Sequence, residues 1–266
     1  MTPGVAVANG RTRFTVRAPH AETLMLCLFE NEKEQQLAMV RSGDFWTIEL
    51  AGDRTGTRYG YRACGEWNPG AGLWFDPAKL LVDPHAIALD GPFRFDQSLS
   101  IYGIDTAAIV PKAIVTTPPS VSQKPPCFQH GGLVYEVNVR GFSMLHPDVP
   151  EAQRGTVAAL AHPAIIKHLK RLHVSAIELM PIIAWIDERH LPPLGLSNAW
   201  GYNPIAPMAL DPRLCPGGVA ELRETVATLQ AEGIGVILDI VLNHTGESDV
   251  LGPVLGAGQA EQRPPG

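Results

Sequence analysis

The sequence predicts a protein of two parts, an antiparallel β-sandwich of immunoglobulin type followed by a parallel α/β unit. Up to about residue 110, short runs rich in β-branched and aromatic residues alternate with turn-forming residues, which is typical of antiparallel strands. After residue 131, apolar strands alternate with segments of helical periodicity, which is typical of a parallel sheet covered by helices. The expected divisions are a sandwich with its extension at 1–110, a linker at 111–130, the α/β unit at 131–254 and a divergent tail at 255–266.

In the first part, four segments carry the strand pattern: "TRFTVRA", "TLMLCLF", "DFWTIEL" and "RYGYRA". Alternation of Phe14 and Val16 with polar neighbours indicates strands with one buried face, as in a sandwich. From about 66 to 110 the sequence is rich in Gly, Pro and aromatic residues, which predicts a long ordered excursion. Residues 111–130 are rich in proline without apolar periodicity, which predicts a stiff linker.

In the second part, the pattern predicts three strands and two helices in alternation. The strands are expected within "LVYEVNVRGF", "SAIELMPI" and "GVILDIVLNHT". Between them, "HPAIIKHLKRLHV" and "GGVAELRETVATLQAEG" place apolar residues at helical spacing, and Gly233 is typical of the position that ends a helix. The order β-α-β-α-β predicts a parallel sheet with helices packed outside it.

Composition excludes several classes of partner. The formal net charge is −6 and no dense run of Lys or Arg occurs, so a nucleic-acid partner is not expected. The four cysteines are scattered without a C-x-x-C pair, so neither a zinc site nor a disulfide framework is expected. No signal peptide and no apolar stretch of about 18 residues is recognisable. We therefore expect a soluble, cytoplasmic protein without a membrane partner.

The third expected strand carries polar residues at its end. Asp239, Val241 and Asn243 are two apart and so share one face, with His244 directly following. Buried polar groups in a parallel strand are costly unless a partner or a ligand satisfies them. In barrel enzymes, functional groups gather at the C-terminal strand ends. The strand alone leaves open whether Asp239 pairs structurally and His244 is an ordinary loop histidine.

An aromatic-rich turn precedes that strand. "SNAWGYNP" places Trp200 and Tyr202 together, and aromatic faces stack on sugar rings while amide and imidazole groups bind hydroxyls. Tyr202 with Asn243 and His244 is thus a candidate sugar site, with a core-packing role for Tyr202 as the alternative. Glu136 and Glu178 could supply the carboxyl pair of a glycosidase, but their mid-strand position favours buried salt bridges, so we assign no catalytic pair.

The segments "LVYEVNVRGFSMLHPDVPEAQRGT", "LHVSAIELMPI", "GLSNAWGYNPIAPMALDPR" and "GVILDIVLNHT" resemble, in order and spacing, the start of the (β/α)₈ barrel of the α-amylase superfamily. More narrowly, they are similar to bacterial glycogen debranching enzymes of the isoamylase type. The segments "TRFTVRAPHAETLMLCLF" and "RYGYRACGEWNPGAGLWFDPAKLLVDPHA" resemble the carbohydrate-binding sandwich that precedes the barrel in those enzymes. The resemblance covers roughly residues 10 to 254. The motif D-x-V-x-N-H is by itself a moderate indication of this family, and it becomes a strong one together with W-G-Y-N-P upstream and with the sandwich.

The resemblance implies roles for matching positions. His244 corresponds to the residue that contacts the sugar at the cleavage subsite, Tyr202 to the aromatic that stacks on that sugar, and Asp239 and Asn243 to residues that organise the strand ends. The family's nucleophile, general acid and third carboxylate follow the fourth, fifth and seventh strands, so no catalytic residue is expected in this chain. The implied reaction is retaining hydrolysis through a glycosyl-enzyme, with no organic cofactor or assigned metal. Calcium dependence stays open.

The resemblance also sets an expectation about length. A closed barrel takes about 250 residues, whereas 131–266 predicts only three barrel strands. The tail "VLGAGQAEQRPPG" leaves the family pattern. We therefore expect that a premature stop or frameshift ended the coding region near residue 254, and that the chain alone is inactive. Whether another polypeptide supplies the remaining strands is open.

Two classes of function compete at this point. The first is hydrolysis of α-1,6 branch linkages in glycogen or its limit dextrin, with a branching or trehalose-releasing activity as a narrower alternative. The second is a non-catalytic module that binds glycogen or another branched α-glucan through exposed Trp46 or Trp67 in the sandwich. Burial of both tryptophans is the more ordinary expectation.

Overall fold

The computed structural model describes residues 2–31, 33–117, 127, 130–248 and 252–256. Within these ranges, no helix has the length and apolar character that crossing a bilayer requires. Most of the predicted linker and the tail after residue 256 lie outside the described residues.

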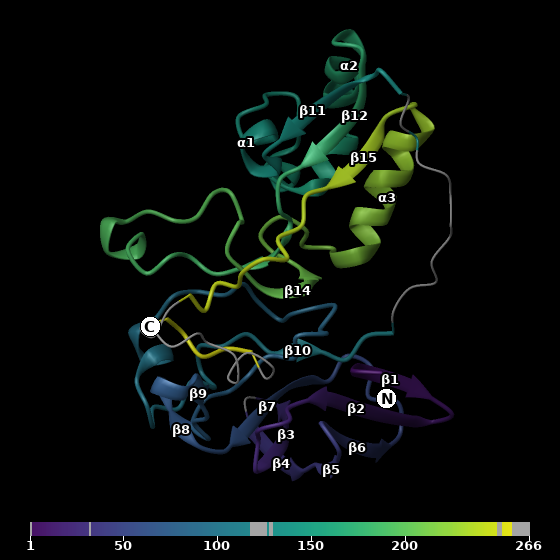
Figure 1. Cartoon of the computed structure of the whole chain (residues 1–266). Coiled ribbons are helices and arrows are strands. Elements are labelled where there is room, and N and C mark those ends of the chain that lie inside the picture. The colour runs from purple at the N-terminus through teal and green to yellow at the C-terminus, as the bar shows by residue number, and fades with distance from the viewer. Residues whose placement is uncertain (1, 32, 118–126, 128–129, 249–251, 257–266) are drawn as a thin grey trace.

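The N-terminal part consists of two four-stranded antiparallel sheets (Figure 1). The first sheet has the order β1 (Gly4–Ala8), β2 (Arg11–Arg17), β6 (Phe45–Ala51) and β5 (Val40–Ser42). The second has the order β10 (Ala113–Ile114), β7 (Arg58–Cys64), β3 (Thr23–Glu30) and β4 (Lys33–Ala38). The four predicted strands are β2, β3, β6 and β7, and the remaining four lie at the edges of the sheets.

The core of the sandwich is rich in aromatic side chains, and the carboxylate of Asp83 is buried among them. Phe14, Tyr59 and Tyr61 are fully buried, and the two tyrosines lie edge-on with ring centroids 5.9 Å apart. The Tyr59 hydroxyl donates to Asp83 at 2.8 Å, and burial raises the pKa of that carboxyl above its ordinary value. Because Asp83 lies in the predicted excursion, this bond fixes the excursion to the sheet.

The excursion is ordered, as predicted, and contains a small hairpin of β8 (Trp67–Asn68) and β9 (Leu73–Trp74), with 3₁₀ turns at Pro69–Ala71 and Gln97–Ser100. Lys79 is fully buried, and its ammonium group donates to the carbonyl oxygens of Ser98 and Ile104. Pairing of β10 with β7 continues to residue 114, beyond the expected boundary at 110. The first residues of the expected linker are therefore part of the sandwich.

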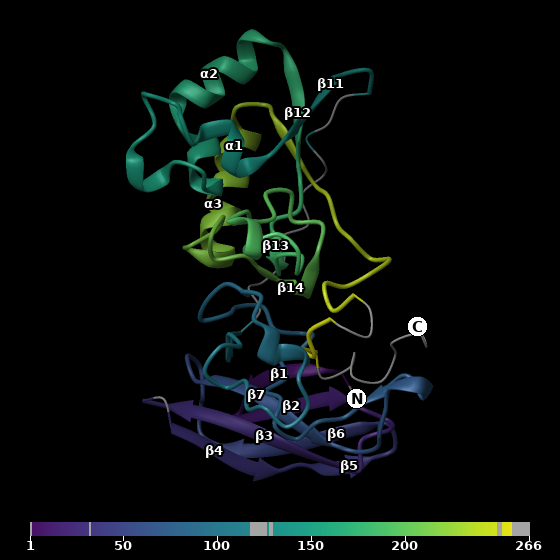
Figure 2. The ribbon, with the colours of Figure 1, turned by 90° about the vertical axis from the view of Figure 1, so that its left-hand side faces the viewer.

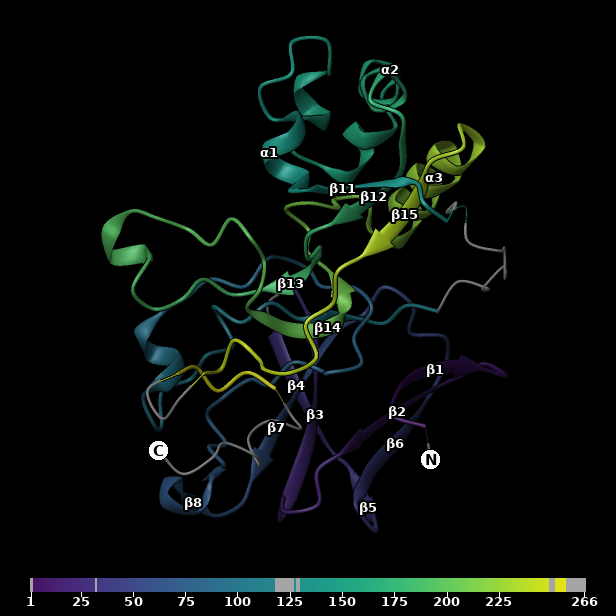
Figure 3. The same cartoon turned by 45° about the horizontal axis from the view of Figure 1, so that its top comes forward.

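The C-terminal part contains a parallel sheet of β11 (Leu133–Val137), β12 (Val174–Leu179) and β15 (Gly235–Leu238), in that order. Figure 3 shows α1 (Val139–Ser143), α2 (Pro163–Arg171) and α3 (Gly218–Ala231) around this sheet. Short 3₁₀ turns at Glu151–Gln153 and Val157–Ala161 join α1 to α2. Apolar side chains from the helices and the covered sheet face form one core: Ile165, Leu169, Ile177, Leu179 and Leu229.

Two strand ends differ from the prediction. The strand expected up to residue 142 ends at Val137, because Asn138 caps the short helix α1 by accepting the Gly141 amide at 2.7 Å. The strand expected over 235–245 ends at Leu238. Its neighbour β12 ends at the paired residue Leu179, so no further parallel partner is present in the described part.

The other face of this sheet carries the acidic strand residues. Glu136, Glu178 and Ile237 occupy paired positions across the three strands, so their side chains share one face. The prediction of buried salt bridges was wrong: Glu136 is exposed, Glu178 is half-buried, and neither pairs with a basic side chain in the described part of the chain.

A second hairpin joins the two parts. It consists of β13 (Ile183–Trp185) and β14 (Pro204–Leu210), and Figure 2 shows it between the parallel sheet and the sandwich. The loop inside the hairpin contains a 3₁₀ turn at Pro192–Leu194. Apolar residues of the hairpin belong to the sandwich core: Ala184, Ile186, Ile205, Ala206 and Ala209. The expected unit 131–254 is thus continuous with the sandwich in its packing.

A short segment, Gly252–Gly256, also lies on the sandwich, and we call it the strap. Val254 and Leu255 are buried in the sandwich core, and the Val82 amide donates to the Leu255 carbonyl at 2.6 Å. Buried Glu247 accepts the amides of Leu255 and Gly256 at 2.6 and 2.8 Å. The strap therefore returns the chain from the parallel sheet to the sandwich.

Candidate functional site

The candidate site lies where the three parallel strands end. Asn138 follows β11, Met180 follows β12 and Asp239 follows β15. Backbone pairing continues one residue past β12 and β15, because the Met180 amide donates to the Val137 carbonyl and the Asp239 amide to the Leu179 carbonyl, each at 3.0 Å. The three side chains are therefore held at one edge of the sheet.

Three of the predicted residues form one hydrogen-bonded group. The Tyr202 hydroxyl donates to Asp239, and this bond is the main reason that the pKa of Tyr202 rises to about 12. His244 Nε2 lies 2.8 Å from the Tyr202 carbonyl oxygen. A carbonyl oxygen only accepts, so Nε2 carries the proton and Nδ1 remains an acceptor.

Asn243 does not join this group. Its side chain is exposed and makes no hydrogen bond to another described residue. The prediction that Asp239, Val241 and Asn243 share a strand face was wrong, because β15 has already ended before them. Asp239 is half-buried. Leu242, which the strand pattern would place on the apolar face, is almost fully exposed.

An open hollow of about 740 Å³ lies beside Tyr202 and is lined by Glu136, Asn138, Met180, Ala199, Trp200 and Tyr202. The ring of Trp200 is 67% exposed, and Asn138 donates to the Ala199 carbonyl at 2.7 Å, which fixes the turn that carries Trp200. Aromatic rings combined with carboxylate and amide groups can stack on a sugar ring and bind its hydroxyls. The sequence did not single out Asn138, although its place after a parallel strand was a usable signal.

The backbone segments that carry Tyr202 and His244 are hydrogen-bonded to each other and lie in close contact. The Gly246 amide donates to the Pro204 carbonyl at 2.7 Å. A Cβ atom on Gly246 would lie only 2.7 Å from both the Asn203 carbonyl oxygen and the Ile186 side chain. Asn203 also donates to the Ile186 carbonyl at 2.8 Å. Only a glycine lets the segment after His244 approach the hairpin this closely.

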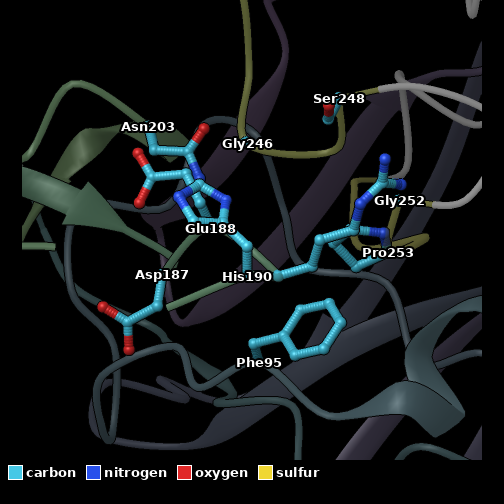
Figure 4. A pocket seen from close by; sticks show the side chains of 10 residues that line it. Phe95, Asp187, Glu188, His190, Asn203, Gly246, Ser248, Gly252 and Pro253 are labelled. Carbon is cyan, nitrogen blue, oxygen red and sulfur yellow. The ribbon is translucent and has the colours of Figure 1, made fainter. Parts of the chain in front are cut away.

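Figure 4 shows a smaller hollow of about 240 Å³ next to this junction. Its lining includes Phe95 from the sandwich part, Glu188 and His190 from the hairpin loop, and Pro253 from the strap. Asn198 donates to Glu188 at 3.0 Å from its side chain. This hollow shows that the sandwich, the hairpin loop and the strap meet beside the candidate site.

The two sandwich tryptophans have different environments. Trp46 is only 5% exposed and its indole nitrogen donates to the Ala18 carbonyl at 2.9 Å, so a stacking role for Trp46 is wrong. Trp67 is half-buried and contacts Trp74 and Tyr102, with ring centroids 5.3 and 4.6 Å away. Tyr102 is 53% exposed, so an aromatic surface remains accessible at Trp67.

Cysteines and metal-ligating residues add no further site. All four cysteines are free thiols. Among the residues that the structure describes, no group of three or more His, Cys, Asp or Glu side chains could hold a metal ion.

Comparisons with known proteins relate this chain to bacterial glycogen debranching enzymes. Residues 3–86 match the family described as carbohydrate-binding module 48, the isoamylase N-terminal domain. The glycogen debranching enzyme of Yersinia pseudotuberculosis serotype IB is 46% identical over 270 residues, which covers 96% of this chain and 41% of the relative. The glycogen debranching enzyme of Yersinia enterocolitica is 45% identical over 258 residues, which covers 91% of this chain and 39% of the relative. The chain is therefore similar to these enzymes over nearly its whole length and spans less than half of theirs.

Several solved structures share the fold of this chain. A product complex of the glycogen-degrading pneumococcal virulence factor SpuA has a TM-score of 0.72 at 22% identity, over 94% of this chain and 28% of that one. Pullulanase type I of Bacillus subtilis, complexed with maltose, has a TM-score of 0.67 at 21% identity, over 92% and 34%. At this identity the likeness concerns the fold alone.

Proposed function

We propose that this chain supplies the sandwich and the sugar-contacting side of a glycogen debranching hydrolase that acts on α-1,6 branch linkages of glycogen or its limit dextrin. The identity of 46% to glycogen debranching enzymes over nearly the whole chain carries this proposal. The same relatives favour debranching over a branching or trehalose-releasing activity. A cytoplasmic place of action belongs to the proposal.

In this proposal the three parallel strands are the first three of a (β/α)₈ barrel, and their ends form the subsite for the sugar at the cleaved bond. Asp239 holds the Tyr202 hydroxyl and thereby fixes the plane of the ring against which the sugar stacks. His244 offers Nδ1 to a sugar hydroxyl, because its Nε2 hydrogen is used by the Tyr202 carbonyl. Trp200 extends the aromatic surface of the hollow.

None of these matched positions supplies the nucleophile or the general acid of the implied retaining mechanism. We therefore expect the chain by itself to bind branched α-glucan without hydrolysing it, and to need no organic cofactor. Release of oligosaccharides from glycogen by the purified chain, followed by chromatography, would contradict this expectation.

Binding is tested by electrophoresis in gels that contain glycogen. The folded chain should be retarded, and Tyr202→Ala or Trp200→Ala should reduce the retardation. Leu145→Ala is a matched control, since Leu145 is an exposed apolar residue that does not line the hollow. Unretarded migration of the folded protein, or equal retardation of all variants, would contradict the proposed subsite.

A second candidate is glucan binding by the sandwich through Trp67 and Tyr102, which present the exposed aromatic surface of that part. Here Trp67→Ala and Tyr102→Ala should abolish retardation while Tyr202→Ala leaves it intact. The pattern of losses among the variants thus distinguishes the two surfaces.

A further inference from the structure

A separate hollow of about 300 Å³ is lined by three arginines and shares only Ala199 with the glucan hollow. Arg94 comes from the excursion of the sandwich, Arg140 from α1 and Arg213 from the segment after β14. Because these segments lie far apart in the sequence, the cluster is a product of the folded arrangement of both parts.

One of the three guanidinium groups is held rigidly. Arg213 donates to both carboxylate oxygens of Asp211 at 2.8 Å and to the Trp185 carbonyl at 3.0 Å. It also lies 4.0 Å over the Trp185 ring. These bonds occupy Nε and Nη2, so Nη1 is the part of this guanidinium, already held in place, that remains for an oxyanion in the hollow.

The other two arginines have no acidic partner. Arg94 and Arg140 are exposed, and neither forms an ion pair with a carboxylate in the described ranges. Of the carboxylates next to the lining, Asp211 binds Arg213, while Asp187 and Glu188 accept from the neutral Asn198 and keep their negative charges. The hollow therefore presents two arginines outside any described ion pair, in a protein whose net charge is −6.

A buried donor at the hollow also lacks an acceptor. Trp185 lines the hollow and is only 4% exposed, yet its indole nitrogen has no hydrogen-bond partner in the described structure. Buried N–H groups are nearly always satisfied, so this donor, which belongs to a residue of the lining, is a candidate partner for a ligand oxygen.

We propose that this hollow binds a phosphate group, either as a monoester on a hexose or as free inorganic phosphate. Arg94, Arg140 and Arg213 bind the phosphate oxygens, and the Trp185 indole donates to one of the remaining oxygens. The volume suits a hexose phosphate, which is a small ligand by the standard of protein sites. Ser197 and Asn198 of the lining precede Trp200, so the ligand contacts the turn that carries the exposed indole of the glucan hollow. The proposal does not depend on the glucan assignment.

The test is calorimetric titration of the purified full chain with a hexose 6-phosphate and, separately, with inorganic phosphate, at low ionic strength. Saturable binding is expected, and Arg94→Gln and Arg140→Gln should each weaken it about tenfold, since each removes a charge-assisted contact. Arg17→Gln is the matched control, because Arg17 is an exposed sandwich arginine that pairs with Asp44. Trp185→Phe keeps the ring under Arg213 and should weaken binding about threefold.

The outcomes separate the sources of the phosphate. Tighter binding of the hexose phosphate identifies a sugar phosphate as the ligand, whereas equal binding of both identifies the free oxyanion. The proposal is overturned if neither titrant binds saturably at concentrations up to about 10 mM. Binding that is much weaker than that of ordinary ligands would still be detected at this concentration. It is also overturned if Arg17→Gln weakens binding as much as Arg94→Gln and Arg140→Gln do.

Discussion

Replacing Glu247 by alanine should destabilise the protein more than its position near a loop suggests. Glu247 is 2% exposed, and one of its oxygens accepts the amides of Leu255 and Gly256 at 2.6 and 2.8 Å. A hydrogen bond to a charged group contributes about 1.5–3 kcal/mol. Two such bonds give roughly 3–6 kcal/mol, which is partly offset because the variant no longer buries a carboxylate. The expected loss is about 2–4 kcal/mol.

Urea denaturation followed by tryptophan fluorescence measures this loss. Glu247→Gln is the matched control: its amide oxygen can still accept both N–H groups, so its loss should stay near 1 kcal/mol. Limited proteolysis should cleave the alanine variant faster in the strap, since the two freed amides no longer hold the strap to the segment that carries residue 247. A loss below about 1 kcal/mol for the alanine variant, or equal losses for both variants, would refute the reasoning.

Three further outcomes are expected. Tyr202 should titrate at about pH 12, and at a lower pH in Asp239→Asn, as measured by absorbance at 295 nm against Tyr202→Phe. The stabilisation from the raised pKa of Tyr202 is present below the ordinary tyrosine pKa of about 10 and is lost as pH rises towards 12. Hydrogen bonds from buried Arg62 lower the pKa of Glu34, so Glu34→Gln should lower the free energy of unfolding by about 2 kcal/mol above pH 5. The difference between the two proteins should shrink as pH falls below 4, because Glu34 then becomes protonated. Gly246→Ala should lower the melting temperature by several degrees, while Gly91→Ala, where a Cβ meets nothing, should not.

Much of the fold could be predicted from pattern alone. Strands such as β2 and β3 have long apolar or alternating runs, and the helices α2 and α3 have clear apolar faces. The edge strand β4, "KEQQLA", was missed because a polar strand with little burial has no hydrophobic signal. The hairpin of β13 and β14 was missed for another reason: its apolar residues pack on a distant part of the chain, which local periodicity does not reveal.

The candidate site was predicted in part. Tyr202, Asp239 and His244 come together as expected, since motif residues at strand ends share one edge of the sheet. The continuous apolar run "VILDIVL" could not show where β15 stops, because the end of a ladder depends on its neighbour's length rather than on its own residues. Asn243 was therefore assigned to a face that does not exist in the folded chain.

The shared core has a practical consequence for anyone who wishes to dissect this chain. A sandwich expressed alone, ending near residue 117, would lose Ile186, Ile205 and Leu255 from its interior and present the vacated apolar surface to water. We therefore expect that the sandwich, if moved onto another protein, would need the hairpin and the strap as well, because both contribute to its core. The matched segment, residues 3–86, contains neither of them.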